Sequence, residues 1–498
     1  MHSYTPPDDD GYYTTVEHHA FTFNHRYLLL EVESLEVHRL GEDARLLLET
    51  NCVPASEMDW RSKGTAAGLT RKAAGTSFRH LRELGIIVSE RDFHETKHEN
   101  VANDMPESSD YVFMVNVAQI CNLRCAYCYT HEGHFDFEDT KSRKMTPEIA
   151  ARIARFAVRQ FPRARTLCFH FYGGEPLIGF PAIRGLVEET KRNKKRNCNF
   201  EFAITTNGTL LTKEIADFMD EHGFTVFLSI DGPESVHNKF RVFPSGRGSY
   251  DLVRRNYDYL TTKRNIRLIG SSVIRSGWTL PQAEQFLTEI GVDQYKAERV
   301  RVEECNPLGL MPEEHEKYVK DLDTLFDIYV EAVRGNTKPL DYRLTAKILQ
   351  IWTKTKRSHF CPAGERMFGV TADGEIYPCS LHAGRRESFL GTLEGGIDIA
   401  KMFEFRKRIS ADGQETCRTC WNRNLCGGGC SAMTNRFGHE ECDVLKRKSE
   451  IAVAIYDEIS HDDELKFLNL VSPKTYAAVG AIRLETDESE GNRTWPIR

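Results

Sequence analysis

The sequence predicts an α/β protein built around a parallel sheet of six strands. Between residues 111 and 306, apolar runs of strand length alternate with stretches that carry apolar residues at helical spacing. Six strand-helix units of this kind imply a parallel sheet with right-handed crossovers. A chain of 498 residues is too long for one ordinary core, so about three domains are expected.

The expected strands share high apolar content and a length of six to nine residues. They lie at 112–118, 166–171, 200–205, 225–230, 266–274 and 295–302, and the helices between them include 147–160 and 215–222. The carboxyl ends of parallel strands meet at one edge, where parallel barrels keep their sites. We therefore expect the chemistry in the loops that follow these strands.

Residues 17–90 form a small separate module in this interpretation. Strand-like runs at 20–24, 27–32 and 35–40 precede helical patterns at 43–50 and 69–84 and a returning strand at 85–88. This order is that of a winged helix. Residues 1–90 hold 14 acidic and 9 basic side chains, which disfavours a nucleic acid and favours a peptide that adds a strand to a sheet edge. A purely structural role remains open, and residues 91–110 are expected to be a linker.

Composition and charge limit the cellular compartments and the classes of partner that we expect for this protein. No apolar run approaches the ~20 residues of a membrane span, and Met1 to Asp10 lacks a signal-peptide core. We therefore expect a cytoplasmic protein without a membrane partner. The net charge of −7 argues against nucleic acid as the main partner. Fourteen cysteines in such a chain indicate metal or redox chemistry.

Three cysteines follow the first barrel strand at a spacing that suits an iron-sulfur cluster. Cys121, Cys125 and Cys128 would supply three thiolates to a [4Fe-4S] cluster and leave one iron open to a small molecule. A zinc knuckle or chance spacing is the alternative. The motif, with Tyr129 after its last cysteine, resembles that of the radical S-adenosylmethionine (SAM) enzymes. This resemblance implies a partial (β/α)6 barrel and a SAM molecule on the open iron.

The resemblance continues in the loops after the next strands. It implies that the turn after the second strand holds the amino group of SAM and that residues after the third and fourth strands hold its other polar groups. The expected SAM-binding residues are Gly173, Gly174, Glu175, Pro176, Thr206, Asn207, Ser229, Asp231 and Arg241. Ordinary strand-to-helix turns are the alternative for the later residues. For Arg241, a charge that faces SAM and a solvated charge remain equally open.

A second cysteine series in residues 361–445 resembles the SPASM domain, the twin-cluster extension of peptide and protein maturases, with a zinc ribbon as the alternative. The resemblance implies two auxiliary [4Fe-4S] clusters, three in all. Auxiliary cluster I would use Cys361, Cys379 and Cys430, and auxiliary cluster II would use Cys417, Cys420, Cys426 and Cys442. The fourth iron of cluster I would be open or borrow Cys305, whereas Cys52, Cys168 and Cys198 are expected to be incidental thiols.

The resemblance covers residues 17–445 and divides the chain into parts with separate roles. It implies a PqqD-like leader-recognition module at 17–90, a barrel at 111–306, a helical connection at 307–360, the SPASM domain at 361–445, and a C-terminal helix and tail at 446–498. The tail from about residue 461 has no assigned role. The implied partners are a precursor peptide and an electron donor such as flavodoxin or ferredoxin.

The implied function is that of a radical SAM peptide maturase that joins a cysteine sulfur to a carbon as a thioether. A carbon-carbon cross-link, formylglycine formation on a sulfatase, and a non-catalytic iron-sulfur electron carrier are the alternatives. Sulfatase maturases carry an aspartate base after the cysteine aligned with Cys379, where this chain has Ser380. A serine is a poor base at its normal pKa, so formylglycine formation is disfavoured and no catalytic base is assigned.

Overall fold

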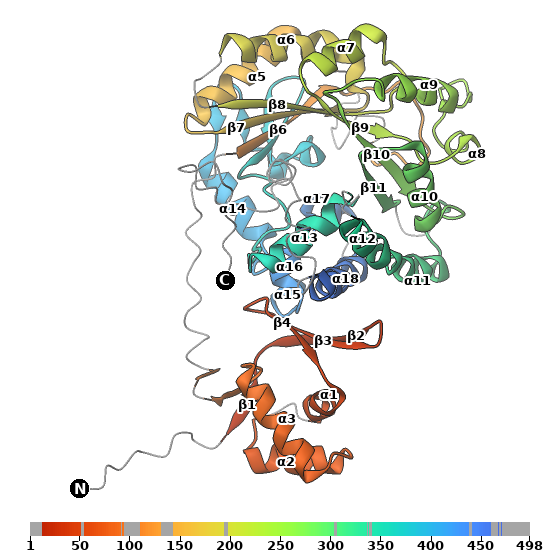
Figure 1. The fold of residues 1–498 in the computed structure, drawn as a ribbon. Helices are drawn as coiled ribbons and strands as arrows, with labels where there is room; N and C mark the ends of the chain where they lie inside the picture. Colours follow the sequence, from red (N-terminus) through yellow and green to blue (C-terminus); the bar gives the residue numbers. More distant parts are fainter. Residues whose placement is uncertain are drawn as a thin grey trace.

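The computed structural model describes most of the chain and shows the α/β fold that the sequence predicts (Figure 1). The described residues are 12–50, 54–90, 92–93, 110–130, 143–193, 198–302, 306–335, 337, 341–437, 441–459, 467 and 470. Cys52, Cys305, most of the expected linker and nearly all of the tail lie outside them.

The central sheet contains the six expected parallel strands in sequence order from its middle to one edge. These strands are β6 (Asp110–Ala118), β7 (Thr166–Gly173), β8 (Asn199–Thr206), β9 (Thr225–Ser229), β10 (Arg267–Ile274) and β11 (Gln294–Arg299). Their bounds differ from the expected ones by at most three residues. The carboxyl ends of all six therefore meet at one edge of the sheet.

Helices cover the outer face of this sheet (Figure 1). The helices and short turns between the strands are α5 (Pro147–Gln160), η2 (Pro176–Gly179), α6 (Phe180–Arg192), α7 (Lys213–Glu221), α8 (Glu234–His237), α9 (Tyr250–Leu260) and α10 (Leu280–Ile290). On β6, Phe113, Val115 and Val117 belong to the large core, so the alternating residues face the inner side. That inner side looks toward the C-terminal third of the chain.

The cysteine-rich region extends the same sheet beyond β6. β12 (Met367–Val370) runs parallel to β6, and β13 (Glu375–Tyr377), β14 (Gly391–Thr392) and β15 (Gly396–Ile397) add antiparallel strands. The sequence did not predict this continuity, because pairing between strands about 250 residues apart leaves no local pattern.

The remaining helices are α11 (Pro312–Asp321), α12 (Thr324–Arg334), α13 (Tyr342–Trp352), η3 (Ser380–His382), η4 (Arg386–Ser388), α14 (Ile399–Ile409), α15 (Glu415–Arg418), α16 (Arg423–Cys426), α17 (Ser431–Phe437) and α18 (Cys442–Ile459). Figure 1 shows α12, α13, α16, α17 and α18 on the inner side of the sheet. α18 packs against α12 and α13 through buried aliphatic residues. The region therefore closes the concave side of the sheet.

The N-terminal module combines two small sheets with three helices. Its elements are β1 (Tyr13–Thr15), β2 (His18–Phe23), β3 (Arg26–Glu31), β4 (Val37–Leu40), α1 (Glu42–Glu49), α2 (Glu57–Ala66), α3 (Arg71–Glu83) and β5 (Ile87–Ser89). The returning strand β5 pairs with β1, so the module begins before residue 17. α2 was not predicted; a capping box between Ser56 and Asp59 starts it, although it lacks an apolar stripe.

The module is packed against the rest of the protein. Phe23, Leu28 and Leu30 are buried in the large core, whereas Leu29 faces the module's own core. The Phe23 ring lies 5.1 Å from that of Phe326 on α12, between ring centres. The three-stranded sheet is thus covered on both faces.

Among the described residues, no helix is long and apolar enough to cross a membrane.

Candidate active site

The turn after β7 packs directly on the strand that leads to the first cysteines. Gly173 has a φ of +135°, and a Cβ there would lie 2.3 Å from the carbonyl oxygen of Ala118. The backbone N–H of Gly174 donates to that oxygen at 2.8 Å, and the N–H of Glu175 donates to the Ile120 oxygen at 2.9 Å. Only glycine fits at position 173, because a side chain there would push the two segments apart.

The Glu175 carboxylate ties this turn to β8. It is fully buried and accepts from the Thr206 hydroxyl at 2.7 Å, the Asn207 N–H at 2.8 Å and the Leu177 N–H at 3.0 Å. Burial raises its pKa, although these three donors oppose the change. Glu175 and Thr206, both expected SAM ligands, thus bond to each other, and the carboxylate orders the turn.

Donors from β8 and the cysteine loop face the first cysteine group. The Asn207 amide lies 3.7 Å from the Cys121 sulfur and 3.0 Å from the Asn122 side-chain oxygen. The Leu123 N–H donates to the same sulfur at 3.4 Å. Hydrogen bonds to a cysteine sulfur stabilise its thiolate, the form that binds iron. Asn207, an expected SAM ligand, thus contacts the first cysteine loop in this structure.

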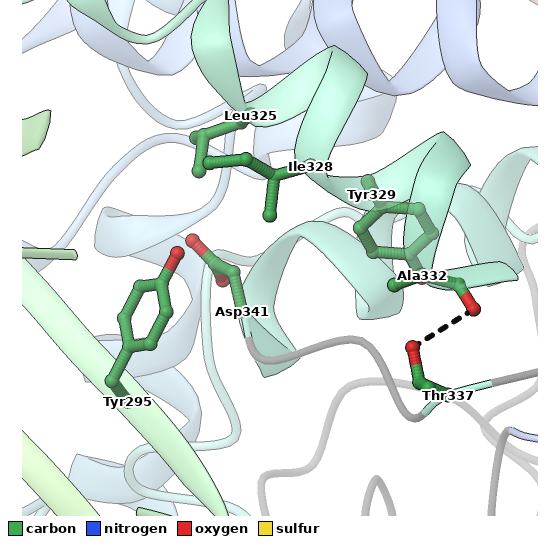
Figure 2. Close-up of a pocket in the computed structure, with 7 residues that line it drawn as sticks. All are labelled: Tyr295, Leu325, Ile328, Tyr329, Ala332, Thr337 and Asp341. Atoms are coloured by element: carbon green, nitrogen blue, oxygen red, sulfur yellow. Dashed lines mark hydrogen bonds between the residues drawn. The ribbon is translucent and has the colours of Figure 1, made fainter. Parts of the chain in front are cut away.

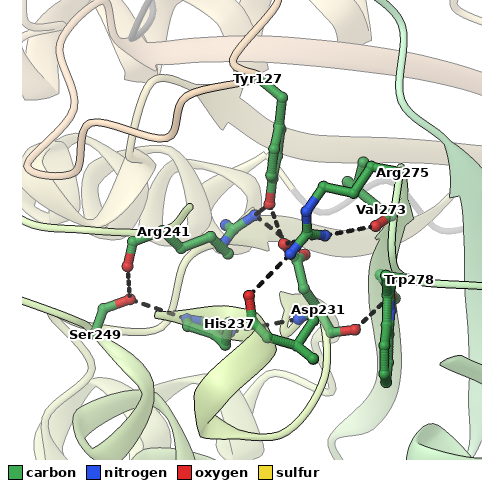
Figure 3. Close-up of polar contacts among 10 residues, drawn as sticks. Tyr127, Asp231, His237, Arg241, Ser249, Val273, Arg275 and Trp278 are labelled. Carbon is green, nitrogen blue, oxygen red and sulfur yellow. Dashed lines mark hydrogen bonds and ion pairs between the residues drawn. The ribbon is translucent and has the colours of Figure 1, made fainter. Parts of the chain in front are cut away.

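A buried network of charged side chains contacts the first cysteine loop through Tyr127 (Figure 3). Tyr127, between Cys125 and Cys128, donates a short hydrogen bond to the Asp231 carboxylate and accepts one from Arg241 at 2.9 Å. Arg275 approaches the same carboxylate at 3.5 Å. Two guanidinium groups thus face one buried carboxylate and one phenol. The network fixes the position of Tyr127 and, with it, of its neighbouring cysteines.

A neutral histidine completes this network. The His237 ring lies 2.9 Å from the Ser249 hydroxyl, and Ser249 donates to the Arg241 carbonyl oxygen at 2.7 Å. Burial, assisted by Arg241 and Arg275, lowers the pKa of His237 to about 3. The ring is therefore uncharged at neutral pH and works as a hydrogen-bonding bridge.

These contacts bear on two expected SAM ligands. Arg241 is 8% exposed, so it is not a solvated charge. Asp231 and Arg241 both point into the network around Tyr127, while Ser229 lies half-buried at the end of β9. Sequence reasoning did not find Tyr127 or Arg275 as members of the site. Asp231 was the residue that could have pointed to these partners, because a buried carboxylate requires cationic or hydroxyl partners.

Two sets of the later cysteines interact electrostatically. Burial, assisted by the nearby Cys430, raises the pKa of Cys361 to about 11, and Cys379 interacts with both of these thiols. Arg406 donates to the Cys361 carbonyl oxygen at 2.9 Å, and the half-buried Arg357 also interacts with Cys361. Half-buried cations beside thiolates suit an anionic cluster.

The second group surrounds a cavity of about 330 Å³. Its cysteines interact electrostatically with one another and all line the cavity; they are Cys417, Cys420, Cys426 and Cys442. Cys442 begins α18, where the helix dipole favours a negative sulfur. Gly427 to Gly429 all have positive φ, and Cys430, which follows them, also lines this cavity.

These arrangements fit iron-sulfur clusters. The described cysteines are free thiols; those of the first group lie in one loop, and those of the later groups come from several segments between residues 361 and 442. Within the described part of the chain, no three His, Cys, Asp or Glu side chains are close enough to share a single metal ion. Cys121, Cys125 and Cys128 would hold the cluster that binds SAM, and the two later groups would hold clusters that accept electrons.

Ser380 lies on the inner side of the sheet. It occupies the position at which sulfatase maturases carry an aspartate. It is buried, and its hydroxyl lies 3.5 Å from the Met114 carbonyl oxygen on β6. A Cβ on Gly369 would lie 2.4 Å from the Cys379 carbonyl carbon. This close approach presses the Cys379–Ser380 segment against β12.

A separate cavity of about 230 Å³ lies between β11 and α12. Figure 2 shows Tyr295 and Asp341 facing each other across it, with Leu325 and Ile328 on its apolar wall. None of the expected site residues lines this cavity. It is therefore not part of the site described above.

Comparison with known proteins agrees with this geometry. Residues 115–280 match the radical SAM superfamily. An uncharacterised protein of Archaeoglobus fulgidus is 27% identical over 72% of this chain and 83% of its own length. A cysteine-type anaerobic sulfatase-maturating enzyme of Clostridium perfringens is 27% identical over 62% of this chain and 85% of its own. A serine-type enzyme of Klebsiella aerogenes is 26% identical over 66% and 81%.

Solved structures share the fold. The structure of anSMEcpe with bound AdoMet and the Kp18Cys peptide has a TM-score of 0.59 at 22% identity, covering 70% of this chain and 99% of that one. Its complex with AdoMet alone gives 0.56 at 21% identity, with 72% and 98% covered. The shared fold thus extends beyond the residues of the superfamily match.

Proposed function

We propose that this chain, in which residues 115–280 form a radical SAM domain, oxidises a side chain of a peptide substrate. The observation that carries the proposal is the contact between the Gly173–Glu175 turn and the loop of Cys121, Cys125 and Cys128. An electron carrier would not need a glycine turn packed this closely against its cluster loop.

The cofactors supply the bond breaking: a SAM molecule on the first cluster provides hydrogen-atom abstraction from carbon. The chain's own residues orient this chemistry. Asn207 and Tyr127 fix the cysteine loop, and the buried network of Asp231, Arg241 and Arg275 prevents its movement. An external one-electron donor such as flavodoxin or ferredoxin would start each turnover.

The product that we propose is a thioether between a cysteine sulfur and a carbon. Its formation removes one hydrogen atom from carbon, one proton from the thiol and one electron, and creates one carbon-sulfur bond. The three-thiol group of Cys361, Cys379 and Cys430 supports this product, because a [4Fe-4S] cluster with three protein ligands leaves an iron for the substrate sulfur. That cluster would also receive the electron.

Formylglycine formation on a sulfatase is the second candidate. The sulfatase-maturating relatives favour it. Ser380 opposes it, because a buried serine that contacts the Met114 carbonyl oxygen lacks the basicity of a carboxylate. The two candidates share hydrogen-atom abstraction and differ in the fate of the cysteine sulfur.

We propose that the N-terminal module binds the leader segment of the peptide substrate. The outer edges of β2 and β4 have no strand partner among the described residues, so an extended leader segment could add to either. Acidic charge on the module favours a basic leader.

The test is anaerobic incubation of the reconstituted full-length chain with SAM, dithionite and a pool of cysteine-containing peptides. A thioether product loses two hydrogens, resists thiol alkylation and carries no aldehyde. A formylglycine product is instead trapped by a hydrazide reagent. Cleavage of SAM with no change in any peptide or sulfatase fragment would contradict the proposal.

A further inference from the structure

Asn116 on β6 is a fully buried carboxamide that no other described group satisfies. It is 0% exposed, and within the described residues neither its Nδ2 nor its Oδ1 has a hydrogen-bond partner. A carboxamide carries two donor hydrogens and an acceptor oxygen. Leaving them unpaired in a protein interior is costly, so such a group normally meets a ligand or water.

The pleat of β6 places this side chain on the inner face of the sheet. Val115 and Val117, its neighbours along the strand, belong to the large core on the outer side of the sheet. Asn116 therefore shares the inner face with Met114, and on β7 it is in register with Tyr172. By contrast, His170 on β7 has a partner, because its ring lies 2.8 Å from the Thr205 hydroxyl.

This part of the inner face lies between the group of Cys121, Cys125 and Cys128 and the group of Cys361, Cys379 and Cys430. Met114 packs against the small buried cluster that contains Cys379, and Cys361 packs against the same cluster. On the other side, the Tyr172 hydroxyl is 2.8 Å from that of Tyr129, the residue after Cys128. Asn116 is thus between the place where hydrogen abstraction would start and the place where a substrate sulfur would be held.

We propose that Asn116 binds the backbone of the substrate at a residue beside the one that is modified. In an extended peptide the N–H and the carbonyl oxygen of one residue point to the same side, and the Oδ1 and Nδ2 of one carboxamide can pair with both. This inference rests on the proposed function, since it assumes a peptide between the two cysteine groups. It makes Asn116 a substrate-binding residue whose partner arrives only with the peptide.

The variant Asn116→Leu tests the proposal because it keeps the shape and removes the polar atoms. Cys168→Val, on the inner face of β7 at the level of Val112, is the matched control. Thermal unfolding is measured for both variants and the wild type, alone, with SAM, and with N-methylacetamide as the simplest peptide-bond probe. SAM cleavage is then followed as the cysteine-peptide pool is titrated.

We expect Asn116→Leu to unfold about 1–3 °C above the wild type when free, because it removes an unpaired buried amide. The shift caused by SAM should be unchanged. Stabilisation by N-methylacetamide should be lost, and the peptide concentration for half-maximal SAM cleavage should rise about tenfold or more. Cys168→Val should match the wild type in both responses.

Three results would overturn the proposal. A lower unfolding temperature with an unchanged N-methylacetamide response would mean that water satisfies the amide. A lost SAM shift would make SAM the partner. An unchanged peptide response would remove the contact from substrate binding. If the cysteine-peptide pool does not change SAM cleavage even in the wild type, the proposed function fails. The comparison of unfolding temperatures with N-methylacetamide still decides whether Asn116 binds an amide group.

Discussion

Gly173 shows how one residue links the turn after β7 to the first cysteine loop. Its replacement by alanine would place a Cβ 2.3 Å from the Ala118 oxygen. We expect Gly173→Ala to lower the free energy of unfolding by at least about 3 kcal/mol and to reduce the iron bound by the first cysteine group. Urea unfolding and iron analysis measure both effects.

Gly223 is the matched control, because it also has a positive φ, of +62°, but nothing lies within 4 Å of its would-be Cβ. Gly223→Ala should cost only about 1–2 kcal/mol and leave iron unchanged. Equal losses in the two variants would mean that the contact with Ala118 is unimportant.

Asp231 was expected from the sequence to contact SAM, whereas its structural contacts are Tyr127, Arg241 and Arg275. Asp231→Asn would leave two buried guanidinium groups without their counter-charge. We therefore expect a loss of about 3–5 kcal/mol in the free energy of unfolding, measured by urea denaturation. Glu234→Gln, at an exposed position three residues later, is the control. Weaker SAM binding at normal stability would instead support the expectation that Asp231 contacts SAM.

At this scale the sequence was informative for residues that carry a fixed motif. The spacing of Cys121, Cys125 and Cys128 and the two-glycine turn were visible directly. Arg275 and Asn116 were not, since an arginine or asparagine in a strand has no spacing that distinguishes a site from a surface. Their roles depend on which face of a strand is buried, and this is decided by tertiary packing.

Among the elements, the barrel strands were predicted because their apolar runs are long and regular. α2 and the β12–β15 extension were missed for opposite reasons: α2 is set by its cap rather than by apolar periodicity, and β12 by a distant partner. The module was expected to be separable, but Phe23, Leu28 and Leu30 belong to the large core.

This packing changes what deletion of the module should do. Removing residues 1–93 would expose the partners of these apolar side chains on α12 and α18, each contributing about 1.5–3 kcal/mol when buried. We expect the truncated chain to aggregate or to unfold well below the full-length protein in a thermal scan. Arg39→Ala, which removes a pair with Asp457 on α18, should loosen the module more mildly. A truncated chain of full stability would contradict the docking described here.

For the whole molecule, the buried His237 and the half-buried His170 predict how stability depends on pH. Burial lowers the pKa of His237 to about 3 and that of His170 to about 4, both below the ordinary value of 6.5. The unfolded chain therefore binds more protons between these values, so stability is lost as the pH falls below about 6.5. Each histidine contributes up to about 1.4 kcal/mol per pH unit.

Urea unfolding of the wild type and of His237→Gln between pH 7 and pH 5 measures this dependence. We expect the variant to be less stable at pH 7 but to lose stability less steeply. The same slope in both proteins would show that His237 is not held neutral by its burial.

The central claim is that three separate cysteine groups each hold a cluster and that the first group cleaves SAM. The most direct measurement is iron content together with SAM cleavage in the wild type and in the Cys121→Ala/Cys125→Ala/Cys128→Ala variant, with Cys168→Ala as the control. We expect about 12 irons in the wild type and in the control, and about a third fewer in the triple variant, with no SAM cleavage. SAM cleavage that persists in the triple variant, or an unchanged iron content, would contradict the claim.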